Sequence, residues 1–111
     1  MLNTPYNLTA VRADSTTINL AWQVISADED GFKIERMRSD ETEFTELASS
    51  ITQDYIDTVS IFYSYFYRVK SYIGNATSSP SNVAEVVAAV KYKYETTKNT
   101  AFGGEYIKKD F

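Results

Sequence analysis

The sequence FYSYFYRVKSY at residues 62–72 contains six aromatic rings in eleven residues. Because successive side chains of a β-strand point to opposite faces, Tyr65, Tyr67 and Val69 would share one face of a strand. A strand with large residues at every second position is typical of the centre of an antiparallel sheet that buries one face. We therefore place these three residues and Ser71 in a core, and we place the intervening residues on the outer face: Phe66, Arg68, Lys70 and Tyr72.

Short stretches of β-branched and aromatic residues recur along the rest of the chain, separated by polar turn clusters. This spacing predicts an all-β domain in which two antiparallel sheets pack as a Greek-key sandwich. At residues 17–23, Ile18, Leu20 and Trp22 alternate with smaller or polar residues, so Trp22 is also expected in the core. The seven expected strands cover residues 8–11, 17–23, 32–37, 44–47, 54–58, 63–73 and 81–87.

The composition limits the classes of function. The 111 residues suffice for one domain, and they include no cysteine and no histidine. Disulfides and thiolate metal sites are therefore excluded, and the usual general base near neutral pH is missing, so we expect no catalytic residues, no cofactor and no metal. The net charge of −4 argues against nucleic acid as a partner. No apolar run approaches the roughly 18 to 20 residues that membrane insertion requires.

Taken in order, the segments resemble the fibronectin type III domain over residues 5 to about 87. The matching segments are INLAWQ at 18–23, DGFKIERM at 30–37, DYIDT at 54–58, YFYRVKSY at 65–72 and SPSNVAEV at 79–86. The resemblance implies a seven-stranded immunoglobulin-like β-sandwich whose single core tryptophan is Trp22. It also implies that Tyr65 is the tyrosine corner, whose hydroxyl bonds to nearby backbone, with Val59 in the place usually held by leucine.

The amino-acid sequences of these segments are most similar to the bacterial type of this domain, which is found between domains of secreted polysaccharide-degrading proteins and surface proteins. That resemblance implies a non-catalytic spacer or protein-interaction module of a larger extracellular or cell-surface protein, with the neighbouring domains as partners. A carbohydrate-binding accessory module that uses exposed aromatic residues is the alternative function.

The sandwich is expected to occupy residues 1–88, and residues 89–111 are expected to form a C-terminal extension. The sequence VAAVKYKYE at 87–95 continues the alternation of a strand, although several valines from residue 83 on also fall at helical spacing. Beyond residue 95 the turn residues and glycines are typical of a linker or of the start of a following module. We favour the linker or following module over an integral part of the sandwich.

Two loops are candidate interaction sites. The first carries Asp28, Glu29 and Asp30, the densest group of carboxylates. Loop oxygens can hold calcium, but the spaced ligands and bidentate glutamate of a calcium loop are missing, so a solvated acidic loop is favoured over a metal site. The second loop reads GNATSSP at 74–80, in the place where some members of the resembling family bind cells. Its candidate residues are Asn75, Thr77 and Ser78.

Exposed aromatic rings supply a candidate ligand site, because such rings stack on the faces of sugars. Phe66 and Tyr72 are expected on the outer face of the long strand, and Tyr92 and Tyr94 of the extension add two more rings. We call these four residues the aromatic platform, and its predicted partner is a polysaccharide or a protein ligand. The alternative is that Phe66 and Tyr72 only pair with residues of neighbouring strands.

Overall fold

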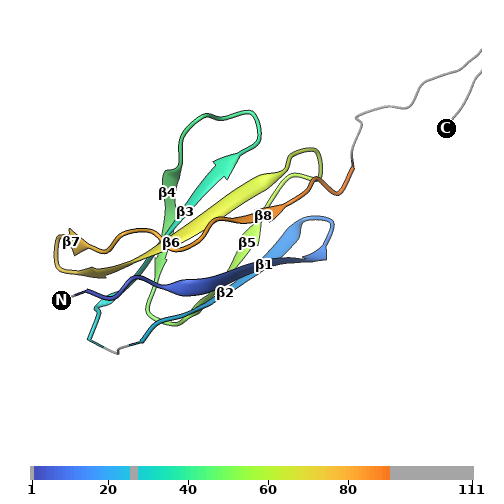
Figure 1. Cartoon of the computed structure of the whole chain (residues 1–111). Helices are drawn as coiled ribbons and strands as arrows, with labels where there is room; N and C mark the ends of the chain where they lie inside the picture. The colour runs from blue at the N-terminus through green and yellow to red at the C-terminus, as the bar shows by residue number, and fades with distance from the viewer. Residues whose placement is uncertain (1, 26–27, 91–111) are drawn as a thin grey trace, which may run out of the picture.

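A computed structural model of the chain describes residues 2–25 and 28–90 (Figure 1). These residues form strands and loops, and no helix capable of crossing a membrane occurs among them. The strands predicted at 17–23 and 54–58 have the predicted bounds. The eight strands are β1 (Tyr6–Asp14), β2 (Thr17–Gln23), β3 (Gly31–Arg38), β4 (Thr45–Ser50), β5 (Asp54–Thr58), β6 (Tyr65–Ile73), β7 (Ala76–Thr77) and β8 (Ala84–Val86).

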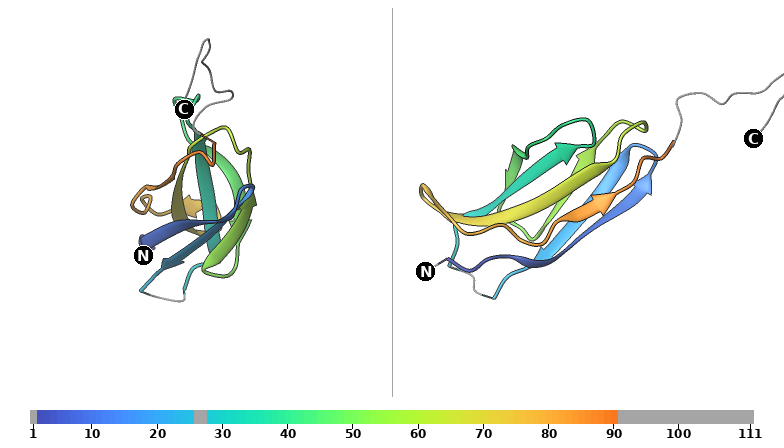
Figure 2. Two further views of the ribbon diagram at one scale, coloured as in Figure 1. Left: turned by 90° about the vertical axis from the view of Figure 1, so that its right-hand side faces the viewer. Right: turned by 45° about the horizontal axis from the view of Figure 1, so that its top comes forward.

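The strands form two antiparallel sheets, which Figure 2 shows as the two layers of a sandwich. One sheet has the order β1-β2-β5, and the other has the order β4-β3-β6 with both β7 and β8 paired to β6. The pairing of Ile34 with Val69 places apolar residues of β3 and β6 side by side on the same face. The predicted all-β sandwich of two antiparallel sheets is confirmed.

The core lies between the two sheets and follows the alternation that the sequence shows. In β6 the buried positions are Tyr65, Tyr67, Val69 and Ser71, and each is exposed by 3% or less. Trp22 of β2 is 3% exposed, and its ring meets that of Phe32 from the opposite sheet edge to face, with 5.5 Å between centroids. The other buried apolar residues are Leu8, Ile18, Leu20, Ile34, Val59 and Val86.

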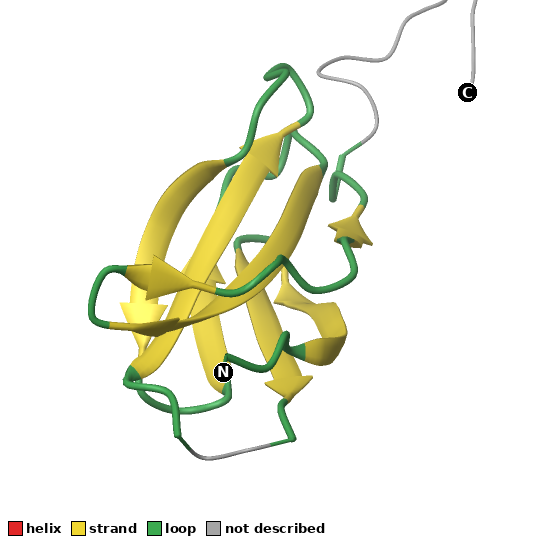
Figure 3. Cartoon of the chain, turned by 60° about the vertical axis from the view of Figure 1, so that its left-hand side comes forward, coloured by secondary structure: helices red, strands yellow, loops and turns green. Residues whose placement is uncertain are grey.

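The last part of the sandwich differs from the prediction of one loop at 74–80 followed by one strand at 81–87. Figure 3 shows two short strands here, β7 and β8, separated by a loop. Gly74 has a φ of +56°, which glycine adopts without steric cost, so a tight turn returns the chain along β6 and Thr77 pairs with Tyr72. The prediction of an unpaired loop was therefore wrong at Ala76 and Thr77.

Pro80 explains why β7 and β8 are not one strand. Proline has no N–H to donate to a ladder, so regular pairing with β6 stops around it. Ser78 and Ser81 bridge the interruption in the same way: each donates its N–H to a carbonyl of β6 and accepts an N–H of β6 with its hydroxyl. The backbone of β6 thus remains hydrogen-bonded although the neighbouring strand is broken.

Tyr65 makes the hydrogen bond that a tyrosine corner requires. Its hydroxyl oxygen accepts the N–H of Ser60 at 2.9 Å, and the adjacent Val59 is 8% exposed within the core. The bond closes the connection between β5 in one sheet and β6 in the other. Ile61 and Phe62 stand where the family usually has proline and glycine, and the hydrogen bond forms nevertheless.

Tyr65→Phe is expected to lower the free energy of unfolding by about 1 to 3 kcal/mol, because it leaves the partly buried Ser60 N–H without its acceptor. Chemical denaturation measures this loss. Tyr63→Phe is the matched control: Tyr63 is half-buried, and its hydroxyl has no hydrogen-bond partner in the described part of the chain, so its loss should stay within about 0.5 kcal/mol. Equal losses for the two variants would contradict the role given to the Tyr65 hydroxyl.

Candidate functional site

The two predicted interaction loops lie at one end of the sandwich, and hydrogen bonds join them. The Gly74 N–H donates to Asp30 Oδ2 at 2.8 Å, and the Asp30 N–H donates to the Tyr72 carbonyl at 2.8 Å. Asp28 is exposed and Glu29 is half-buried. Among the described residues, no three side chains of the metal-binding types lie close enough together to hold an ion. By accepting the Gly74 N–H, the Asp30 carboxylate caps the β6–β7 turn.

The remaining candidate loop residues differ in how available they are. Asn75 and Thr77 are exposed in the β6–β7 hairpin. Ser78 is half-buried, and its hydroxyl accepts the Ser71 N–H and donates to the Ser79 carbonyl. Ser78 is thus part of the sheet, whereas Asn75 and Thr77 are open to a partner.

Phe66 and Tyr72 of the aromatic platform do not lie together. Both are on the outer face of β6, but at about 3.3 Å per residue they are about 20 Å apart, with Arg68 and Lys70 between them. Both residues are half-buried. The Tyr72 ring covers Gly31 of β3, where an added Cβ would lie 3.0 Å from a ring carbon. The other two platform residues, Tyr92 and Tyr94, lie outside the described residues.

The outer face of β3 and β6 carries a network of charges. Arg68 Nε donates to Glu35 Oε1 at 2.6 Å, and Lys70 Nζ lies 3.3 Å from Glu35 Oε2. Burial disfavours the charged form of Glu35, but the hydrogen bonds and charges of Arg68 and Lys70 outweigh it and hold the pKa of Glu35 below its ordinary value. This face is therefore an ionic surface interrupted by single rings.

Glu35→Gln is expected to lower the melting temperature by a few degrees near pH 7, since such pairs contribute about 0 to 1 kcal/mol. Because the pKa of Glu35 is lowered on folding, its ionised form stabilises the folded state above the ordinary pKa, and this contribution is lost as the pH falls through the folded-state pKa. The difference from the parent chain should therefore shrink in thermal scans as the pH falls below the ordinary pKa of glutamate. Glu46→Gln, which removes an exposed pair with Lys33 on the same face, is the control. A difference that grows in acid would contradict the assignment.

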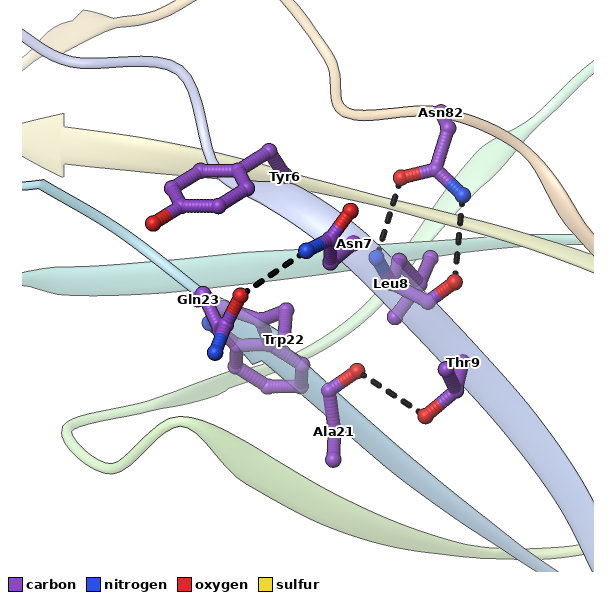
Figure 4. Close-up of a pocket in the computed structure, with 8 residues that line it drawn as sticks. All are labelled: Tyr6, Asn7, Leu8, Thr9, Ala21, Trp22, Gln23 and Asn82. Atoms are coloured by element: carbon purple, nitrogen blue, oxygen red, sulfur yellow. Dashed lines mark hydrogen bonds between the residues drawn. The ribbon is translucent and has the colours of Figure 1, made fainter.

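A depression of about 900 Å³ opens where β1 begins to pair with β2 (Figure 4). Two residues of β1, Asn7 and Leu8, together oppose the single residue Trp22 of β2, so the strand bulges here. Asn7 has a φ of +53°, the one positive φ among the non-glycine residues described. Asparagine tolerates this region better than most residues, but the conformation remains strained. The lining consists of Tyr6, Asn7, Leu8, Thr9, Ala21, Trp22, Gln23 and Asn82.

Side-chain amides hold the bulge. Asn7 Nδ2 donates to Gln23 Oε1 at 2.9 Å. On the other side of the strand, Asn82 Oδ1 accepts the Leu8 N–H at 2.9 Å and Asn82 Nδ2 donates to the Leu8 carbonyl at 3.1 Å (Figure 4). Asn82 thus replaces the peptide group of a neighbouring strand and closes the edge of β1 at this point.

Trp22 is one of the lining residues, and its buried indole has an unpaired donor. Its Nε1–H is the one buried side-chain polar atom of the described residues that lacks a hydrogen-bond partner. Leaving a buried donor unpaired costs about 1 to 3 kcal/mol. Trp22 and the strained Asn7 therefore both line the depression. Buried unpaired groups and backbone strain gather at functional sites more often than elsewhere.

The polar residues of this depression are not among the candidate site residues predicted from the sequence. The one local signal is Asn7, just before the strand predicted at residues 8–11, because asparagine is enriched at positive φ. The contact between Asn82 and Leu8 joins residues 74 positions apart, and it depends on how the last strand passes β1. No local pattern reports such a contact.

A buried polar group joins the two sheets. Asp57 of β5 is 4% exposed; it accepts the hydroxyl of Tyr67 at 2.7 Å and Arg36 Nη1 at 2.9 and 3.2 Å. Burial and the hydrogen bond to Asp57 raise the pKa of the Tyr67 phenol well above its ordinary value. The alternation of side chains in β3 places Arg36 on the same face as the buried Ile34. This position of an arginine is the signal in the sequence for the buried polar group. We assign this group a structural role, because the carboxylate of Asp57 is hydrogen-bonded to Tyr67 and Arg36.

Comparison with known proteins identifies the architecture. No protein family model and no curated protein matches this sequence. Among solved structures, a human fourth FNIII domain has a TM-score of 0.69 at 15% identity and covers 86% of this chain and 87% of that one. The fold is that of a fibronectin type III domain.

Two further structures show the same fibronectin type III fold. The FN5 domain of Drosophila Lar has a TM-score of 0.65 at 16% identity and covers 79% of this chain and 97% of its own. A crystal structure of several titin domains has a TM-score of 0.68 at 14% identity over 79% of this chain. The present chain spans 32% of that titin fragment. At these identities the likeness establishes the fold and not the function.

Proposed function

We propose that the chain is a non-catalytic fibronectin type III module that acts as a spacer or protein-interaction domain in a larger protein. The resemblance of its segments supports a bacterial, extracellular or cell-surface setting as part of the same proposal. The titin and Lar structures that share the fold are domains of named longer proteins, which supports a modular role. The partners proposed are the neighbouring domains.

The observation that carries the proposal is the position of the first and last residues that the structure describes. Near the start of the described chain, the Ser71 hydroxyl donates to the Asn3 carbonyl at 2.7 Å. Near the other end, the Ala88 N–H donates to Ser64 Oγ at 3.1 Å and the Val90 N–H donates to the Ile61 carbonyl at 3.0 Å. The chain therefore enters at one end of β6 and leaves at the other.

This arrangement suits a spacer. The distance from residue 64 to residue 71 along β6 is about 23 Å at roughly 3.3 Å per residue, and the strand is held on both sides by its neighbours. Figures 1 and 2 show the N-terminus beside the β6–β7 turn and the exit after β8 at the opposite end. Domains attached at the two ends would thus be kept apart by the length of the sandwich.

Spin labels at the two ends test the spacer role. Because the chain has no cysteine, Thr4→Cys and Ala89→Cys, both at exposed positions, give a doubly labelled protein without background labelling. Pulsed electron paramagnetic resonance is expected to give one narrow distance distribution near 25 Å. The same protein in denaturant is the control and should give a broad distribution near 50 Å, the value of a flexible chain of this length. A broad distribution under native conditions would overturn the proposal.

A further inference from the structure

The depression around Asn7 has the composition of a site for a neutral, hydroxyl-rich ligand. We propose that it binds a neutral saccharide unit, with Tyr6, Asn7 and Gln23 as the contact residues. This inference goes beyond the spacer role and does not depend on it. It also differs from the aromatic platform, because it uses the opposite sheet and different rings.

Asn7 and Gln23 have hydrogen-bonding groups that their own contact leaves unused. The bond from Asn7 Nδ2 to Gln23 Oε1 uses one donor and one acceptor of the pair. Asn7 Oδ1 and Gln23 Nε2 have no partner within the described residues, and both side chains are exposed. The pair therefore presents a free acceptor and free donors next to each other. Neighbouring sugar hydroxyls, each of which donates and accepts, match such a pair.

The backbone strain at Asn7 fixes the orientation of these amides. The positive φ of Asn7 is not required by a tight hairpin turn, since it occurs at a bulge within a strand. Its effect is to turn the Asn7 side chain toward Gln23, as Figure 4 shows. A strained residue that fixes two amides in one orientation pre-organises a site, because their ordering is not left to the binding step.

Tyr6 offers an aromatic surface to the apolar side of the ligand. Tyr6 is 42% exposed and pairs with Gln23 across the two strands, so its ring lies on the same face as the free amide groups. Ala21 is small and leaves room between the rows of side chains. A pyranose ring carries hydroxyls at its rim and C–H groups on its faces, and an exposed aromatic ring beside amides offers both kinds of contact.

The uncharged lining and the occupied edge of β1 argue against other ligand classes. None of the eight lining residues is charged, so the site has no group that would attract an ion. An extended peptide would add to β1 through backbone hydrogen bonds, but Asn82 already occupies the N–H and the carbonyl of Leu8. Side chains, and not a free sheet edge, are what this site presents. A saccharide is therefore favoured over a peptide strand.

The full chain can be tested by nuclear magnetic resonance, because its single tryptophan, Trp22, is among the residues that line the depression. The probes are cellohexaose, xylohexaose and hexa-N-acetylchitohexaose, each titrated to about 10 mM, which reaches dissociation constants in the millimolar range. At least one is expected to shift the Trp22 indole resonance together with the side-chain amides of Asn7 and Gln23. No shift with any of the three, or shifts confined to β3 and β6, would overturn the proposal.

Variants locate the contacts. Tyr6→Ala and Gln23→Ala are each expected to weaken binding at least about tenfold, and both residues are exposed, so the fold should be kept. Unchanged thermal unfolding checks that point. Tyr72→Ala removes a ring from the opposite sheet and is the matched control; its affinity should equal that of the parent chain. Unchanged affinity in Tyr6→Ala, or a loss in Tyr72→Ala alone, would overturn the assignment.

Discussion

Replacing Trp22 with alanine is expected to lower the free energy of unfolding by about 3 to 5 kcal/mol. The indole is 3% exposed and lies between the sheets, where it meets Phe32 edge to face. Its removal takes away the buried apolar area and leaves a cavity that the rigid sheets cannot close. Because domains of this size have total stabilities of about 5 to 15 kcal/mol, the variant is expected to be partly unfolded at room temperature. Urea denaturation followed by circular dichroism measures the effect.

Trp22→Phe separates the ring from its unpaired N–H. Phenylalanine keeps most of the buried area and removes a donor that has no acceptor, so the loss should be clearly smaller, within about 1 to 2 kcal/mol. The contrast between the two variants is informative because both change the same position. A loss below about 1 kcal/mol in Trp22→Ala would mean that the indole does not fill the core.

The alternation of side chains was sufficient to predict the sandwich. A strand has a period of two, so the pattern at 62–72 assigns Tyr65, Tyr67 and Val69 to one face without knowledge of any partner strand. The same rule placed Ile18, Leu20 and Trp22 together. These residues then had to face a second sheet, because one layer cannot bury them. Local pattern and the need for burial thus determine the architecture.

Contacts between distant residues could not be predicted in the same way. The break in the last strand is bridged by Ser78 and Ser81, whose hydroxyls accept N–H groups of β6. The closure of the β1 edge depends on Asn82, which lies beside Leu8 only after the sandwich has formed. Serine and asparagine are common in loops, so their identity alone does not distinguish a solvated residue from one that completes a sheet.

The two candidate loops illustrate a middle case. Their composition predicted polar, accessible segments, and Asn75 and Thr77 are exposed. The hydrogen bond between Gly74 and Asp30 was not predictable, because the two loops are adjacent only through the pairing of β3 with β6. For the aromatic platform, the face of the strand was predicted correctly but the closeness of the rings was not. Phe66 and Tyr72 do share a face, but the rise of the strand keeps them apart.

Asp57→Ala is expected to cost about 2 to 4 kcal/mol, although it removes a small acidic residue from a short edge strand. Asp57 accepts hydrogen bonds from both Tyr67 and Arg36 of the opposite sheet. Without it, the buried Tyr67 hydroxyl loses its acceptor and the guanidinium loses its counter-charge. Arg36 is 30% exposed and can regain water, which places the expected loss below that of a fully buried pair. Thermal and urea unfolding measure the change.

Two comparisons show whether the loss comes from the connection between the sheets. Asp54→Ala removes an exposed carboxylate from the same strand and is expected to cost less than about 1 kcal/mol. Asp57→Ala leaves the Tyr67 hydroxyl without an acceptor, and the double variant Asp57→Ala with Tyr67→Phe removes that hydroxyl as well. The loss of stability in the double variant should therefore fall short of the sum of the two single losses by about 1 kcal/mol. Equal losses for Asp57→Ala and Asp54→Ala, or strictly additive losses in the double variant, would show that Asp57 does not join the two sheets. A shortfall of the expected sign would show that one carboxylate between the layers holds a tyrosine and an arginine in the core, where an apolar sandwich would otherwise exclude them.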